Sequence, residues 1–181
     1  MVHMGSTRRN DERTVAGCHR RMRRTDREVV DPGMVERIIR DCRIVDVAYA
    51  DAEGMTIIPM NFGYVIRPDG LPTLYFHSAS HGRKIDAIRA AGNALPVAVS
   101  MRTDCRPIEG RTPCGWGEAF RSVVATGTAS IVEAMEERRE GLRLLMAHQA
   151  DMPDVTFTDQ QVNSVTVWRI DLDHVTGKVH E

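Results

Sequence analysis

The chain has 181 residues, which is enough for one domain with a hydrophobic core. Its formal net charge of −1 does not favour a general nucleic-acid-binding surface. No apolar run is long enough to cross a bilayer, and no apolar segment follows the basic N-terminus as in a secretory signal. We therefore expect a cytoplasmic protein without a membrane anchor.

The cysteines form no C-x-x-C pair, and no histidine completes a zinc pattern with them. We expect reduced thiols and no metal site. The four cysteines are Cys18, Cys42, Cys105 and Cys114.

Residues 1–28 form a polar, arginine-rich segment without a periodic apolar pattern. They hold eight arginines and four acidic residues, a local charge of +4, but no interleaved aromatic residues of the kind that stack on nucleic acids. We expect a flexible, solvated arm followed by one domain over residues 29–181.

The first half of the domain reads as a helix and three strands. Asp31 and Pro32 are typical of the N-cap and first position of a helix. Alternation of apolar residues predicts a strand over residues 42–50 and a second over 55–66, with turns at 51–54 and 67–70. A third strand is expected over residues 73–78.

The second half contains two more helices and three more strands. A helix is predicted over residues 80–91 with Ser80 as its N-cap, followed by a buried strand over 95–102. Residues 103–118 read as a long loop, and long loops in compact domains tend to be functional. The remaining elements are a strand over 120–133, a helix over 134–148 and a strand over 162–175.

This order, α-β-β-β-α-β-β-α-β, favours a mainly β fold with flanking helices. Several strands are long and alternating, which is typical of a closed or partly closed barrel. The short connections at 51–54 and 67–72 exclude the crossovers that a parallel sheet needs. We therefore predict a six-stranded antiparallel barrel.

The start of the 80–91 helix has the features of an anion site. A helix N-terminus presents unpaired backbone N–H groups and the positive end of the helix dipole. Ser78 and Ser80 add hydroxyl donors, and Arg83 and Lys84 add positive charge where helices usually carry acids. The alternative is a solvated helix start with basic residues present by chance.

Several motifs together resemble the nitroimidazole-resistance (Nim) family, which belongs to the pyridoxamine-phosphate-oxidase-like flavin-binding split barrels. Residues 57–64 read Ile-Ile-Pro-Met-Asn-Phe-Gly-Tyr, residues 74–79 read Leu-Tyr-Phe-His-Ser-Ala, and residues 82–86 read Gly-Arg-Lys-Ile-Asp. Residues 22–29, 116–123 and 144–148 also match in order and spacing. The resemblance spans about residues 22–180.

This resemblance implies FMN as cofactor, bound between the two subunits of a homodimer. It places His77 beside the flavin on the substrate side, where an imidazole can donate a hydrogen bond or a proton; the alternative is a structural histidine. Together, the local pattern and the resemblance assign cofactor binding to Ile58, Pro59, Met60, Asn61, Phe76, His77, Ser78, Ser80, Lys84, Trp116, Arg121 and Ser122.

Two of these assignments have further alternatives. Pro59 cannot donate to a sheet ladder, so it marks either a bulge that frees backbone groups for the flavin ring or simply an edge strand. Trp116 either walls the flavin pocket or packs in the core beneath a long loop.

The sequence thus predicts an FMN-dependent oxidoreductase that reduces nitroaromatic or related small electron-poor compounds. Three alternatives remain open: a deazaflavin (F420)-dependent reductase, a haem-binding split barrel, and a non-catalytic flavin-binding protein. The first is compatible with the composition, because 22 of the 24 basic residues are arginine, a bias typical of GC-rich genomes.

Overall fold

The computed structural model describes residues 22–181. Most of the predicted flexible arm, residues 1–21, therefore lies outside the described residues. The end of that arm is structured, because Thr25–Arg27 forms a 3-10 turn and the two-residue strand β1 pairs with the last strand of the domain. The boundary predicted at residue 28 falls inside this strand pair.

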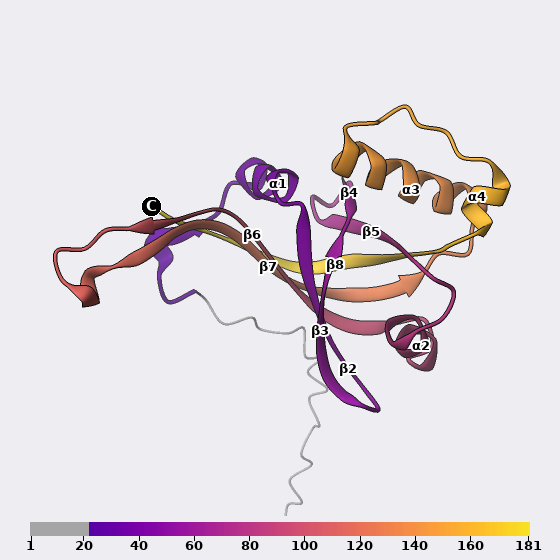
Figure 1. Ribbon diagram of the computed structural model, residues 1–181, viewed down its shortest axis with the longest axis horizontal. Helices are drawn as coiled ribbons and strands as arrows, with labels where there is room; N and C mark the ends of the chain where they lie inside the picture. The colour runs from indigo at the N-terminus through magenta and orange to yellow at the C-terminus, as the bar shows by residue number, and fades with distance from the viewer. Residues whose placement is uncertain (1–21) are drawn as a thin grey trace, which may run out of the picture.

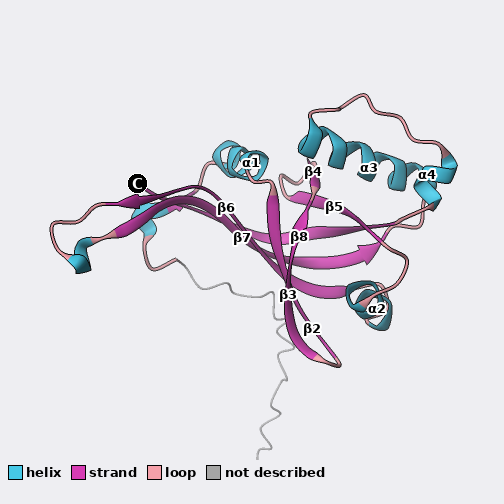
Figure 2. Ribbon diagram, in the orientation of Figure 1, coloured by secondary structure: helices cyan, strands magenta, loops and turns pink. Residues whose placement is uncertain are grey.

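The described chain is mainly antiparallel β-structure with four α-helices (Figures 1 and 2). The strands are β1 (Glu28–Val29), β2 (Ile44–Asp51), β3 (Gly54–Asn61), β4 (Gly63–Ile66), β5 (Pro72–Ser78), β6 (Leu95–Ile108), β7 (Gly117–Ile131) and β8 (Thr166–His180). The helices are α1 (Pro32–Asp41), α2 (Arg83–Ala90), α3 (Met135–Ala150) and α4 (Asp159–Asn163). None of the described helices is long and apolar enough to cross a membrane.

All eight strands belong to one curved sheet with the order β3-β2-β6-β7-β8-β5-β4, and β1 is paired to β8 beside this path. The predicted six-stranded barrel is therefore wrong in strand number, and the sheet is not closed by hydrogen bonds. Its two edge strands, β3 and β4, follow each other in the chain and are separated only by Phe62. The covalent chain, rather than a ladder, joins the two edges.

The predicted strand over 55–66 is thus two strands with different partners, β2 for β3 and β5 for β4. Phe62 turns into the core at the break and is fully buried. The backbone of α3 lies directly on Gly63, where an added Cβ would come within 2.3 Å of the Leu145 nitrogen. His148 Nδ1 lies 2.7 Å from the Phe62 carbonyl oxygen and ties α3 to the same junction.

The predicted loop over 103–118 is mostly a hairpin. Strands β6 and β7 stay paired as far as Ile108 and Gly117, with one register shift between Thr103 and Arg106. Both faces of this outer half are largely solvent-exposed, so the apolar alternation that signals a strand is missing. The hairpin extends from one end of the molecule, opposite the end that carries α2 and α4 (Figure 1).

Two other predicted boundaries shift. The helix expected from Ser80 begins at Arg83 with Gly82 at the N-cap, and the Asp86 carboxylate accepts from the Gly82 N–H at 3.3 Å. The strand expected from Val162 begins at Thr166, because Thr158 and Gln161 form a capping box that starts the short helix α4.

The main core lies on the concave side of the sheet and contains alternate residues of β2 and β7, among them Val45, Val47 and Val123. A second, smaller cluster fills the space between the outer face of β5 and β8 and the helices α3 and α4. This second layer positions the end of β5, where the predicted catalytic residue lies.

Candidate active site

The start of α2 is tied to the β2–β3 turn by Arg83. Its guanidinium donates to both carboxylate oxygens of Asp51, at 2.8 Å each, and to the Gly54 carbonyl at 3.1 Å. The guanidinium also holds the pKa of Asp51 below its usual range. The Arg83 guanidinium is therefore engaged within the fold and joins α2 to the β2–β3 turn. Lys84, by contrast, has no ion pair or hydrogen bond within residues 22–181.

Gly82 gives the helix start a backbone that other residues rarely adopt, with φ of 118°. No atom lies within 4 Å of where its Cβ would be, so the space beside the first turn is open. Asp86 Oδ2 accepts from the Gly82 N–H at 3.3 Å, so Lys84 and the remaining backbone N–H groups of this turn are the ones that fit an anionic group such as a phosphate. Ser80 lies exposed in the preceding loop, with its Oγ 3.5 Å from His81 Nδ1.

Phe76 and Ser78 point into the barrel, not toward the start of α2. Phe76 is stacked on Trp168 with ring centroids 4.2 Å apart, and Trp168 Nε1 donates to Ser78 Oγ at 3.0 Å. Both side chains are buried. Any contact that either residue makes with a ligand outside the barrel comes from its backbone.

The predicted flavin-ring segment lies on β3, which is an edge strand. Pro59 faces Asp46 on β2 in an unbroken register, so the edge-strand interpretation holds and there is no bulge. Ile58 and Met60 pack against the core, whereas Pro59 and Asn61 are exposed on the convex face. The outer edge of β3 has no neighbouring strand within the described chain, so its backbone groups are available to the polar edge of a flavin.

His77 lies on the opposite face of β5 from Phe76 and Ser78. Its side chain is exposed, and its imidazole has no hydrogen-bond partner within the described residues. It lines a cavity of about 250 Å³ between β5, α3 and α4. A larger groove of about 910 Å³ between α1, β4 and α3 contains none of the predicted residues.

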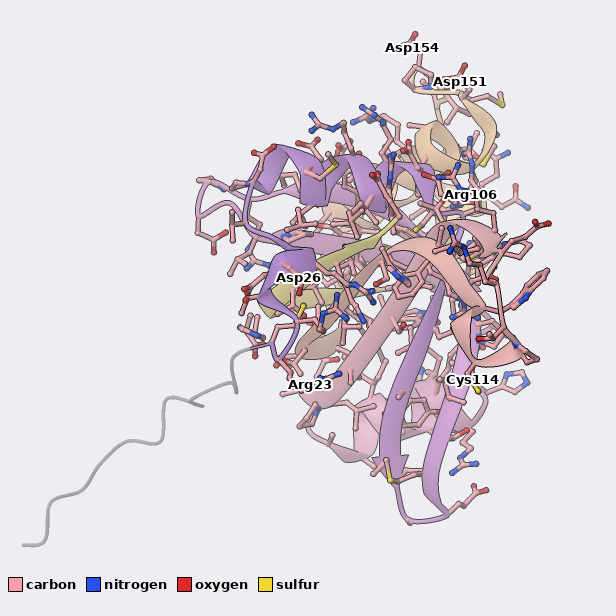
Figure 3. All side chains as sticks on the ribbon, turned by 90° about the vertical axis from the view of Figure 1, so that its left-hand side faces the viewer. Arg23, Asp26, Arg106, Cys114, Asp151 and Asp154 are labelled. Atoms are coloured by element: carbon pink, nitrogen blue, oxygen red, sulfur yellow. The ribbon has the colours of Figure 1, made fainter. Side chains whose placement is uncertain are left out.

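The remaining predicted residues lie on the β6–β7 hairpin. Trp116 is 55% exposed near its tip, which rules out the core alternative, and Arg121 is paired with Asp104 at 3.3 Å. Ser122 follows on β7. Figure 3 views the molecule from the hairpin end, with Cys114 and Arg106 on the hairpin. Within one chain the tip of this hairpin lies at the opposite end of the molecule from α2 (Figure 1).

Three residues that matter at the site were not predicted. Asp51 was assigned only to a turn, yet it orients Arg83. Phe157 and Gln161 line the cavity beside His77. The Thr158-x-x-Gln161 spacing is a capping-box signal that could have predicted α4, and with it the position of Gln161.

The curved antiparallel sheet, whose two edge strands are joined by the chain at Phe62, and its flanking helices define an open, split-barrel-like fold. The sequence matches the family model for pyridoxamine 5'-phosphate oxidase over residues 31–179. The chain therefore belongs to the pyridoxamine 5'-phosphate oxidase family. A search of curated proteins gave no match.

Solved structures agree with this assignment. A candidate 5-nitroimidazole antibiotic resistance protein from Bacteroides thetaiotaomicron is 30% identical, with a TM-score of 0.68 over 84% of this chain and 86% of that chain. An FAD- and haem-binding protein from Mycobacterium smegmatis shares the fold, with 18% sequence identity and a TM-score of 0.71 over 86% of this chain and 74% of that chain. The flavocytochrome Anf3 from Azotobacter vinelandii also shares the fold, with 16% sequence identity and a TM-score of 0.70 over 88% of this chain and 72% of that chain.

Proposed function

We propose that the protein is an FMN-dependent oxidoreductase that reduces nitroaromatic or related small electron-poor compounds. The observation that best supports this proposal is the Lys84 side chain, which has no ion pair or hydrogen bond within residues 22–181. It lies at the start of α2, where the space beside Gly82 is open. The neighbouring edge strand β3 has backbone groups without a partner strand in the described chain. The 30% identity to a candidate 5-nitroimidazole resistance protein supports the substrate class.

Each group in the site has a role in this proposal. Lys84 and the first turn of α2 hold the phosphate, and the edge of β3 over residues 58–61 binds the ring. His77 faces the compound to be reduced and donates a hydrogen bond or a proton to it. FMN, when bound, supplies the electron transfer, and the protein supplies binding, orientation and proton donors.

A homodimer is part of the proposal, because no single chain brings Trp116, Arg121 and Ser122 to the other site residues. The convex face of β2, β3 and β7 carries exposed apolar side chains that fit a second copy of the chain. They are Ile44, Met55, Ile57 and Val124. A cytoplasmic location with reduced thiols completes the proposal.

The direct test is a spectrum of the purified protein, followed by titration of the apoprotein with FMN, F420 or haem. We expect tight binding of FMN alone. Lys84→Ala should weaken FMN binding by roughly ten- to a hundredfold, because a hydrogen bond to a charged group contributes about 1.5–3 kcal/mol.

Arg89→Ala is the matched control, since it removes a cation from the same helix at a position paired with Asp86. Its FMN affinity should equal that of the unaltered protein. An unchanged affinity in Lys84→Ala would remove this lysine from the site, and preferential binding of F420 or haem would replace FMN in the proposal.

A further inference from the structure

His148 lies in the last turn of α3, at a point where three parts of the chain meet. Its Nδ1 atom is 2.7 Å from the Phe62 carbonyl oxygen, at the junction of β3 and β4. Its Nε2 atom is 2.9 Å from the Arg40 carbonyl oxygen, near the end of α1. Because a carbonyl oxygen only accepts, each contact uses an N–H of the ring, and a doubly protonated ring donates to both at once. The half-buried imidazole thus joins α1, α3 and the β3–β4 junction.

The contact with Arg40 completes the end of α1. The last carbonyl groups of a helix have no partner within the helix. The Cys42 N–H donates to the carbonyls of residues 38–39, and the Arg40 carbonyl receives its hydrogen bond from His148. In return, the Arg43 guanidinium donates to the His148 carbonyl near the end of α3. The two helix ends therefore cap each other.

The contact with Phe62 has a different consequence. The Phe62 ring is fully buried, and its carbonyl oxygen also accepts from Gln149 Nε2 at 2.8 Å. The imidazole packs between the rings of Phe62 and Tyr64, with centroids 4.7 and 5.2 Å away. Phe62 directly follows Asn61, which is the last residue of β3 and of the segment proposed to bind the flavin ring. The last turn of α3 thus holds the end of that segment.

Within the described chain β3 is paired on one side only, with β2, so its free edge depends on how its two ends are held. The start of β3 follows the turn that Arg83 fixes through Asp51. The other end is the Phe62 junction, where His148 and Gln149 donate to the same oxygen. The two ends are therefore held by different helices, α2 and α3.

We propose that His148 is a positioning residue of the cofactor site, which fixes the end of β3 through the Phe62 carbonyl and so sets the backbone edge over residues 58–61. Its contact with Arg40 joins the two helices, and its contact with Phe62 serves the site. This inference rests on the proposed function for the identity of the ligand. The position of β3, however, is a property of the chain without flavin.

Two substitutions separate the two contacts. The amide nitrogen of an asparagine takes about the place of imidazole Nδ1, and that of a glutamine takes about the place of Nε2. His148→Asn therefore keeps the donor to Phe62 and loses the donor to Arg40, and His148→Gln does the reverse. Each variant loses one hydrogen bond, so the two should have similar melting temperatures.

The first measurement is amide hydrogen exchange of the full chain free of flavin. The β3 amides that pair with β2 should exchange about tenfold faster in His148→Gln than in His148→Asn, because β3 then opens more easily from its Phe62 end. Gln149→Met leaves His148 in place and removes the other donor to the Phe62 carbonyl, together with a contact to the Arg43 carbonyl at 3.2 Å. It should change β3 in the same direction as His148→Gln.

The second measurement is FMN titration of the same variants, followed by the flavin absorption spectrum. We expect FMN to bind about tenfold more weakly to His148→Gln than to His148→Asn, with a shifted flavin band in His148→Gln. A role confined to the stability of the helices would affect both variants alike.

The outcomes distinguish this inference from the proposed function. Equal exchange of β3 in the two His148 variants overturns the inference, and so does a larger effect in His148→Asn, since both results place the role of His148 at α1. The expected exchange pattern in a protein without FMN affinity supports the positioning of β3 and overturns the proposed function. The expected pattern with equal FMN affinity in both variants refutes the link between the end of β3 and the cofactor.

Discussion

At the scale of single residues, His77 connects the cavity to the proposed chemistry. It is the predicted catalytic residue. Its exposed imidazole has no hydrogen-bond partner within the described residues, while its strand neighbours Phe76 and Ser78 are engaged in the core. Because side chains alternate along β5, His77 reaches the α3–α4 side and not the barrel interior.

We predict that His77→Asn retains FMN but loses turnover. Positioned proton transfer typically contributes ~10²–10⁴-fold, and asparagine can hydrogen-bond but cannot donate a proton in this way. The measurement is single-turnover oxidation of the reduced, FMN-loaded protein by a nitroimidazole, followed over pH. His81→Asn, at an exposed position four residues on, is the matched control.

Equal rates in His77→Asn and the unaltered protein would leave His77 as a structural residue. A slower rate with normal flavin affinity supports the catalytic role. The pH–rate profile then distinguishes a lost proton donor, which removes a pKa from the profile, from a shifted substrate position, which does not.

At the scale of elements, the Asp51–Arg83 ion pair joins the two parts of the proposed cofactor site. Asp51 ends β2 beside the turn into β3, and Arg83 begins α2. The edge of β3 and the phosphate-binding turn therefore keep a fixed separation only while this bidentate pair is intact.

We predict that Asp51→Asn lowers both stability and FMN affinity at neutral pH. Arg83 lowers the pKa of Asp51, so the pair stabilises the fold above the usual pKa of an aspartate and stops doing so as the pH falls through the lowered pKa. The stability difference between Asp51→Asn and the unaltered protein should therefore be present at neutral pH and be lost in acid, as the pH falls through the lowered pKa of Asp51.

Urea unfolding at neutral pH and in acid measures this difference in the free energy of unfolding. Glu53→Gln is the control, because Glu53 is more exposed and lies 3.8 Å from Arg83. A difference that persists unchanged in acid would show that Asp51 stabilises the turn by some means other than its charge.

The elements also show where sequence reasoning succeeds. The alternation predicted strands over residues 42–50 and 120–133, and the structure has strands close to both ranges, because each of these strands has one face on the core. The outer half of the β6–β7 hairpin has no core on either face, so its strands carried no such pattern and read as a loop.

The break between β3 and β4 could not be predicted from local pattern. Residues 55–66 read as one apolar-rich strand, and the chain changes edges at Phe62 because α3 docks on Gly63. That contact joins residues far apart in the sequence. The site was also predicted only in part. Lys84 and His77 have side chains available for ligands, as the sequence suggested. Ser80 is not the helix cap, because α2 begins after Gly82.

At the scale of the whole molecule, the β6–β7 hairpin and the elements α2 and β5 carry predicted site residues at opposite ends of the molecule (Figure 1), and residues 58–61 lie on the edge strand β3. The convex sheet face carries an aligned row of side chains, since Ala48 faces both Ile57 on β3 and Ala98 on β6. Ile57 is 62% exposed and Met55 is 85% exposed, although both are large and apolar.

We predict that the protein is a homodimer that packs through this face, with each site completed by the hairpin of the other copy. Ile57→Asp puts a charge at the centre of the row, where burial on association would require desolvating an unpaired carboxylate. We expect a monomer with weakened FMN binding. Light scattering at several protein concentrations gives the mass, and FMN titration of the same samples gives the affinity.

Met152→Asp is the matched control, because it places the same charge on an exposed methionine of the α3–α4 connection, away from the convex face. It should remain dimeric and bind FMN normally. A dimeric Ile57→Asp variant would move the interface to another surface. A monomeric unaltered protein that binds FMN tightly would mean that one chain is sufficient for the cofactor, and that Trp116, Arg121 and Ser122 serve another purpose.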